Sequence, residues 1–206
     1  MHLFEDLVAL GRSPRLLAAV KDGRGVVNTQ NVRRGVKARR GDGTLGEIVP
    51  GETAIFDQGY KVGRGRIATV EIGVEVKILA KAMIKQIDRV VNDLRNQVDQ
   101  FRQGGGNPIC VGIVGINHAK RCISYEGERA FPTTGKAGFT HPYQEAPEAE
   151  RRLRLDAASK FDEFLVLRYR ATNESPYPFE WVSEKDTRLD YAAALARISS
   201  QYQQRF

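Results

Sequence analysis

A strict alternation of apolar and polar side chains runs through residues 69–79 and constrains the fold more than any other feature of the chain. The apolar positions are Val70, Ile72, Val74, Val76 and Ile78, and the positions between them are Glu71, Gly73, Glu75 and Lys77. Because successive side chains of a strand point to opposite faces, the segment predicts a β-strand with one core face. Neighbours on the polar face are about 7 Å apart, so Glu75 and Lys77 can act on one atom.

A change of period follows this strand. Residues 81–103 carry an apolar stripe at helical spacing, which predicts an amphipathic helix that ends at the glycines before Pro108. Residues 109–116 are apolar apart from two glycines, which predicts a strand buried on both faces. A strand, a crossover helix and a buried strand are typical of a layered α/β fold with a mixed sheet.

The rest of the chain is assigned more coarsely. Short helices are expected over residues 2–9 and after the Ser13-Pro14 cap signature, and a second strand over residues 53–60, which would carry Asp57. Residues 145–160 predict a helix, residues 161–171 a strand, and residues 186–202 a closing helix. Residues 22–46 and 117–143 are expected to be irregular insertions. The whole chain, residues 1–206, is expected to be one domain with a core at about residues 45–120.

Composition limits the class of protein. The chain has a hydrophobic fraction of 41% and a charged fraction of 28%, which allows a buried core and a soluble surface. No apolar run approaches the ~18 residues that a membrane helix needs, and the first residues lack a secretion signal. The two cysteines, Cys110 and Cys122, are too few for a disulfide framework. We therefore expect a cytoplasmic protein without a membrane partner.

Basic residues suggest a polyanionic partner. The net charge is +7, and five cations lie within eight residues: Arg33, Arg34, Lys37, Arg39 and Arg40. A second cluster, Lys61, Arg64 and Arg66, lies around a glycine-rich segment. Cations in such loops suit contacts with phosphates, so both clusters are predicted to bind DNA, with a solvated surface as the alternative. A third cluster, at residues 151–154, is more simply explained by ion pairs with glutamates along a helix.

The element order and the charged residues together resemble the PD-(D/E)XK nuclease superfamily, which includes the type II restriction endonucleases. The resemblance rests on the αβββαβ order, on Asp57 in the predicted second strand, and on Glu75-Val76-Lys77 in the next strand. It covers about residues 45–120. Phe56 stands where the family usually has proline. The resemblance implies a restriction-endonuclease-like αβββαβ core, with a central mixed β-sheet flanked by helices.

The resemblance also implies a site. Asp57, Glu75 and Lys77 would be catalytic, and Asp57, Glu75 and the main-chain carbonyl of Val76 would hold Mg²⁺, with Mn²⁺ as a substitute. These are hard oxygen ligands of the kind that Mg²⁺ prefers. Lys77 would orient the attacking water and stabilise developing charge, as phosphodiester hydrolysis requires. The alternative for Glu75 and Lys77 is a simple ion pair on a solvated sheet face.

Other polar residues are possible accessories. A hairpin turning near Arg64 would place Glu71 opposite Asp57 and make it an additional acid. Gln86 lies in the first turns of the helix at residues 81–103, where some branches of the family use glutamine to steady the lysine or the scissile phosphate. Glu5 and Glu47 are further candidates for an upstream acid.

Nucleotide and zinc sites are not predicted. Thr134-Gly135-Lys136 lacks the upstream glycine of a phosphate-binding loop. His2 and His141 have no partners at ligand spacing, and His118 at the end of a strand suits a structural role.

The sequence therefore predicts a Mg²⁺-dependent endonuclease that acts on double-stranded DNA, most simply a type II restriction endonuclease working as a homodimer. A Holliday-junction resolvase or a DNA repair nuclease is the alternative with the same chemistry. Two alternatives of another class stay open. One is a DNA-binding protein without catalysis, and the other is an α/β protein with a surface ion-pair network and no nucleic-acid partner.

Overall fold

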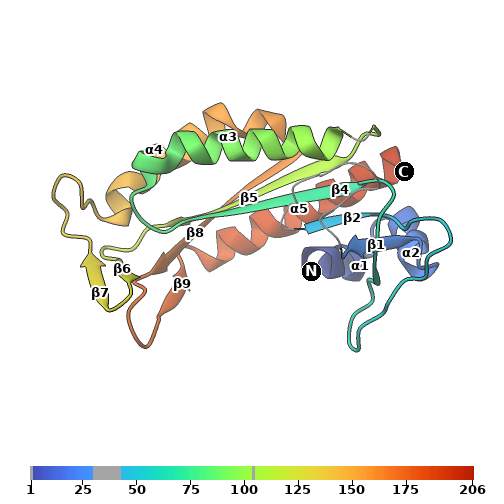
Figure 1. Ribbon diagram of the computed structural model, residues 1–206, viewed down its shortest axis with the longest axis horizontal. Coiled ribbons are helices and arrows are strands. Elements are labelled where there is room, and N and C mark those ends of the chain that lie inside the picture. Colours follow the sequence, from blue (N-terminus) through green and yellow to red (C-terminus); the bar gives the residue numbers. More distant parts are fainter. Residues whose placement is uncertain (1, 30–42, 104) are drawn as a thin grey trace.

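The computed structural model describes residues 2–29, 43–103 and 105–206, which form helices packed against a sheet (Figure 1). The helices are α1 (His2–Leu10), α2 (Pro14–Lys21), α3 (Met83–Arg102), α4 (Pro142–Asp156) and α5 (Glu184–Arg205), with a 3₁₀ turn at Ala158–Lys160. The strands are β1 (Gly25–Asn28), β2 (Gly43–Glu47), β3 (Arg64–Gly65), β4 (Ile72–Leu79), β5 (Ile109–Asn117), β6 (Ile123–Glu126), β7 (Arg129–Pro132), β8 (Glu163–Ala171) and β9 (Phe179–Trp181).

Seven strands form one mixed sheet in the order β3-β1-β2-β4-β5-β8-β9. The central strands β4, β5 and β8 are parallel, with Ile72 opposite Ile109 and Val111 opposite Glu163. Parallel neighbours need a crossover connection, and α3 and α4 supply it here. β2 and β9 run antiparallel to their central neighbours, and β6 and β7 form a separate hairpin. The predicted α/β arrangement with a mixed sheet between helices is confirmed.

Helices cover both faces of this sheet. Figure 1 shows α3 and α4 on one side and α1, α2 and α5 on the other. Each side has its own buried cluster: Leu94 and Val114 belong to the first, and Leu7 and Val111 to the second. Across the described ranges 2–29, 43–103 and 105–206, no helix has the length and apolar character that crossing a membrane requires.

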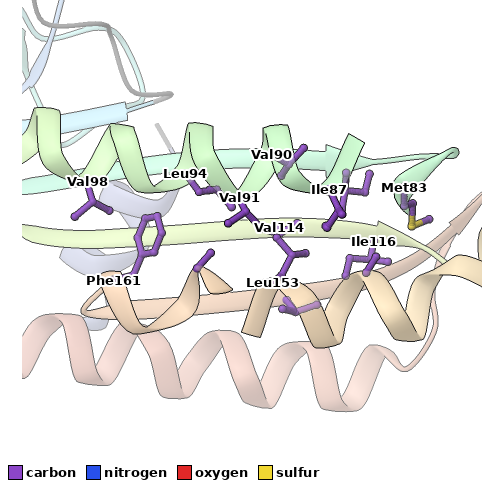
Figure 2. Close-up of a cluster of buried hydrophobic side chains, with 14 of the residues drawn as sticks. Met83, Ile87, Val90, Val91, Leu94, Val98, Val114, Ile116, Leu153 and Phe161 are labelled. Atoms are coloured by element: carbon purple, nitrogen blue, oxygen red, sulfur yellow. The ribbon is translucent and has the colours of Figure 1, made fainter. Parts of the chain in front are cut away.

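The apolar stripe predicted for residues 81–103 is the buried face of α3. Met83, Ile87, Leu94 and Val98 are each no more than 1% exposed, and Figure 2 shows them directed towards β5 and α4. Their spacing of four or seven residues keeps them on one side of a helix with 3.6 residues per turn. The stripe therefore fixes which side of α3 lies on the sheet.

The strand predicted over residues 53–60 is wrong. In this segment only Ile55 forms a β-bridge, with Arg64, and the rest is loop. Ile55 and Phe56 are more than half exposed. A strand is stabilised by packing of its side chains on one face, and no element covers these two residues. Alternation of side chains therefore predicted a strand here, although no other element packs against Ile55 and Phe56.

The two segments predicted to be irregular contain strands. Within residues 22–46, β1 and most of β2 join the main sheet, and residues 30–42 lie outside the described part of the chain. Within residues 117–143, β6 and β7 form the hairpin, with Ser124 opposite Phe131. β9 was not predicted, because three residues beside prolines give no measurable alternation.

Candidate functional site

The central strand β4 carries the candidate residues, and both faces of its first half, Ile72 to Glu75, are buried. Ile72 and Val74 belong to the buried cluster on the side of α1, α2 and α5. On the other face, a Cβ added to Gly73 would come within 2.5 Å of the Phe101 ring of α3. Glu75 lies two residues further along the same face. The polar face of the strand is thus beneath a helix rather than open to solvent.

Glu75 and Lys77 form an ion pair on this face. Lys77 Nζ lies 2.5 Å from Glu75 Oε1, and the Glu75 side chain is only 7% exposed while that of Lys77 is 28% exposed. Water and salt screen charges weakly once they are withdrawn from solvent, so the two groups interact more strongly than a surface pair does. The structure therefore brings together two of the three residues that the sequence predicted to be catalytic.

The ladder with β5 sets the direction of the main-chain groups of β4. The Ile109 nitrogen donates to the Glu71 carbonyl at 2.8 Å. Peptide groups of alternate residues point to the same neighbouring strand, so those of Gly73, Glu75 and Lys77 face β5. The carbonyl of Val76 faces the side of β2, whose described pairing with β4 ends where Gly43 meets Val74.

Asp57 is not brought to this pair. Its Oδ2 lies 2.5 Å from Nε of Arg64 on β3, and β1 and β2 separate β3 from β4. Three strand spacings amount to about 14 Å, so Asp57 and Glu75 do not hold one metal ion. The sequence placed Asp57 in a wide hairpin with residues 69–79. The chain instead closes a short loop in which Ile55 pairs with Arg64.

The predicted position of Glu71 opposite Asp57 is wrong for the same reason. The Glu71 nitrogen donates to the Leu45 carbonyl of β2, and its Oε2 accepts a 2.6 Å hydrogen bond from the Tyr202 hydroxyl of α5. Burial raises the pKa of Glu71, and the hydrogen bond from Tyr202 offsets part of that rise. Because α5 and α3 cover opposite faces of the sheet, Glu71 anchors the closing helix instead of joining Glu75.

Gln86 is engaged at the start of α3. Its Nε2 donates to the Lys81 carbonyl at 3.1 Å, and its Oε1 accepts from Arg89. These bonds tie the first turns of α3 to the end of β4. Neither bond involves Glu75 or Lys77, so the predicted accessory role of Gln86 has no support from its contacts. Glu5, a further acid candidate, instead accepts from the backbone nitrogens of Lys61 and Val62.

The cations predicted to contact DNA differ in their surroundings. Arg64 pairs with Asp57, and Arg66 with Glu52, so both charges are balanced within the loop. Lys61 is exposed, and the remaining predicted cations, Arg33, Arg34, Lys37, Arg39 and Arg40, lie outside the described residues. In the third cluster the three arginines form ion pairs, for example Arg151 with Glu148 at 2.7 Å. Ion pairing of this third cluster along a helix, as the sequence indicated, is confirmed.

The oxygen ligands near Lys77 suit a cation in part. Within residues 2–29, 43–103 and 105–206, no group of three or more His, Cys, Asp or Glu side chains is close enough to hold a metal ion. The Glu75 carboxylate and the Val76 carbonyl are hard oxygen donors on consecutive residues. Mg²⁺ is commonly bound through one or two carboxylates together with water and substrate phosphates. These two oxygen donors fit a site completed by water and phosphate, and they do not fit a site built from protein ligands alone.

Two polar residues that the sequence analysis did not single out help to organise this region. Gln97 is a buried residue on α3, one turn before Phe101 and so on the helix side that covers β4. Asn117 at the end of β5 donates to the carbonyls of Ala80 and Ala171 and accepts from the nitrogens of Ala119 and Ala171. Gln97 interrupts the apolar stripe of α3, and Asn117 ends the apolar run of β5. A polar residue at such a position is the sequence signal that could have identified them.

A pocket lies where Asn117 joins the carboxyl ends of β4, β5 and β8. It has a volume of about 400 Å³ and includes Lys81, Tyr169 and Phe179 in its lining. In open α/β sheets, ligands bind outside the carboxyl ends of parallel strands. About 17 Å of strand separates Glu75 from Ala80 at this end, so the pocket is distinct from the charged pair.

Comparison with known proteins adds no further assignment. The chain matches no protein-family model, no curated protein and no solved structure.

Proposed function

We propose that this chain is a Mg²⁺-dependent DNA endonuclease with a restriction-endonuclease-like core, and that Glu75 and Lys77 are its reactive pair. The proposal rests on one observation, the desolvated ion pair of 2.5 Å on the central strand β4. Strand order is consistent with it. Along the chain, the elements α2, β1, β2, β4, α3 and β5 follow the αβββαβ order. The two-residue strand β3 comes between β2 and β4 in the sequence but lies at the edge of the sheet, beside β1.

The two side chains have different tasks in this proposal. Lys77 is partly exposed and presents its ammonium protons to a phosphate oxygen or to the attacking water. Glu75 is buried, keeps the Lys77 ammonium in place, and offers a carboxylate oxygen beside the Val76 carbonyl. Mg²⁺ held by these oxygens, or Mn²⁺ in its place, would neutralise phosphate charge and activate water. Asp57 has no part in this site.

Double-stranded DNA is the substrate that we infer. Cleavage of both strands with one site per chain requires two chains, so a type II restriction endonuclease acting as a homodimer is the leading form. A Holliday-junction resolvase or a DNA repair nuclease is the second candidate, because the same reactive pair would serve it. The position of Asp57 beside the edge strand β3, away from Glu75 and Lys77, favours a third outcome, DNA binding without cleavage at this site.

Supercoiled plasmid incubated with increasing Mg²⁺ tests the proposal. The wild-type chain is expected to nick or linearise it, with discrete bands indicating restriction. Lys77→Met and Glu75→Gln are expected to lower the rate at least ~10²-fold, the usual loss when one electrostatic group of an active site is removed. Arg64→Met, which breaks the Asp57 pair, is the matched control and should cleave like the wild type.

A second variant separates catalysis from stability. Lys77→Arg keeps a positive charge beside Glu75 but replaces a compact ammonium by a planar guanidinium, so it should fold normally and cleave poorly. Full activity of Lys77→Met, or DNA retention with no Mg²⁺-dependent cleavage by the wild type, would refute the nuclease proposal.

A further inference from the structure

The pocket at the carboxyl ends of β4, β5 and β8 has three structural parts. One part of its lining is Ala80, Asn117 and Ala171, which end the three central strands or lie just beyond them. One wall is the segment leading into β9, and the other is the start of the hairpin β6–β7. A volume of about 400 Å³ lies within the range of small-ligand pockets. A flat ring of modest size is therefore a suitable occupant.

Aromatic rings dominate the wall at β9. Tyr169 and Phe179 stack with ring centroids 5.5 Å apart, and Trp181 and Phe179 form a T-shaped pair with centroids 4.9 Å apart. Phe179 is 57% exposed and Tyr177 67% exposed, so both rings present surface to solvent. Tyr177 also has a φ of 60°, which is costly for a bulky side chain. This wall thus holds an exposed aromatic in a strained backbone conformation, a feature that clusters at binding sites.

The opposite side of the lining adds a hydroxyl and a cation. Ser124 lines the pocket and lies directly opposite Phe131 in the hairpin, and directly opposite residues share one face. The Lys81 ammonium donates to the Phe131 carbonyl at 3.1 Å and lies at the pocket lining. The Asn117 amide is occupied by main-chain bonds, so the Ser124 hydroxyl and the Lys81 ammonium are the polar groups best placed for a ligand.

We propose that this pocket takes an unstacked nucleobase of single-stranded DNA, with Lys81 contacting the adjacent phosphate. The choice of a nucleic acid rests on the proposed function, while the choice of a base rests on the rings. Each base has an aromatic face, so stacking on protein rings tolerates any sequence. The net charge of +7 favours a polyanion over a neutral aromatic ligand. The pocket therefore holds a strand displaced or frayed from the duplex.

The single tryptophan of the chain reports on this binding without any mutation, because Trp181 contacts Phe179. The wild-type protein is titrated with a thymidine 12-mer, and with an abasic 12-mer of equal charge, in a chelator that removes divalent metals. The thymidine oligomer is expected to change the Trp181 emission and to bind at least ~5-fold more tightly than the abasic one. Equal binding of the two oligomers, or an unchanged emission, overturns the proposal.

Variants locate the effect. Tyr177→Leu and Phe179→Leu each remove a ring while keeping apolar bulk. Each should weaken the binding of the thymidine oligomer at least ~5-fold, towards the affinity for the abasic oligomer. The leucine at residue 177 meets the same backbone strain as tyrosine. Phe56→Leu removes an equally exposed ring at the opposite edge of the sheet and should have no effect. Unaltered thymidine binding in both pocket variants would also refute the proposal.

The outcome is separable from that of the nuclease proposal. Binding is measured without metal, and Glu75→Gln, which should not cleave, is expected to bind the thymidine oligomer like the wild type. Base-dependent binding without cleavage in the plasmid assay leaves this inference standing and refutes only the nuclease. Cleavage without base-dependent binding does the reverse.

Discussion

Two ion pairs of equal length lie in very different parts of the sheet. Glu75 and Lys77 meet on the central strand β4, and Asp57 and Arg64 meet beside the edge strand β3, each at 2.5 Å. The Glu75 side chain is 7% exposed, whereas those of Asp57 and Arg64 are 36% and 40% exposed. Contact distance is therefore a poor guide to the strength of a pair. Position in the sheet decides it, because water screens the edge pair and α3 covers the central one.

The largest expected effect on stability comes from breaking the central pair. Lys77→Met leaves the Glu75 carboxylate buried without its ammonium and should lower the free energy of unfolding by about 3 kcal/mol. Arg64→Met leaves an exposed carboxylate that water solvates, so the unfolding midpoint should stay the same. Urea unfolding followed by circular dichroism measures both. Equal losses in the two variants would show that burial does not distinguish the pairs.

A smaller effect tests how closely α3 covers the central pair. Gly73→Ala drives a methyl group against the Phe101 ring and should cost about 2 kcal/mol through overpacking. Gly63→Ala is the control near the edge, since its Cβ would lie 3.1 Å from Ala54 Cβ and 3.2 Å from the exposed ring of Phe56, against 2.5 Å from Phe101 at residue 73. Thermal unfolding of both variants gives the comparison. Adding Phe101→Leu should recover part of the loss at residue 73 and none at residue 63.

The smallest effect concerns Glu71, which is half-buried and bonded to a phenol rather than to a cation. Its pKa in the folded chain is raised by burial, so the folded state holds the proton more tightly than the unfolded state does. Stability should therefore fall as pH rises from about 4.3, the ordinary glutamate value, through the raised folded pKa, and then level off. Glu71→Gln keeps an acceptor for Tyr202 and should flatten this decline.

Urea unfolding between pH 4 and pH 8 measures the difference between wild type and Glu71→Gln. Tyr202→Phe is the complementary variant. It removes the hydrogen bond that partly offsets the rise in the pKa of Glu71, so the decline should extend to higher pH. A wild-type stability that increases over this range, with Glu71→Gln parallel to it, would contradict the assignment.

Local sequence patterns predicted the elements whose side chains pack against another helix or strand. The stripe of α3, the apolar run of β5 and the alternation in β4 each correspond to an observed element. In β4 the burial itself does not alternate, since Glu75 is buried and Ile78 is 63% exposed. The same rule failed at residues 53–60, where alternation exists but no element covers Ile55 and Phe56. It also failed for Glu71, which precedes β4 and turns towards α5 instead of following the polar face.

The sequence by itself determined that Glu75 and Lys77 share one face of a strand, since a spacing of two residues is a property of extended backbone. Tertiary structure alone decided what covers that face, and it separated Asp57 from the pair by placing β1 and β2 between β3 and β4. It also decided which rings meet at the carboxyl ends of the central strands. Strand order joins segments that are remote in the chain, and no local period records which segments those are.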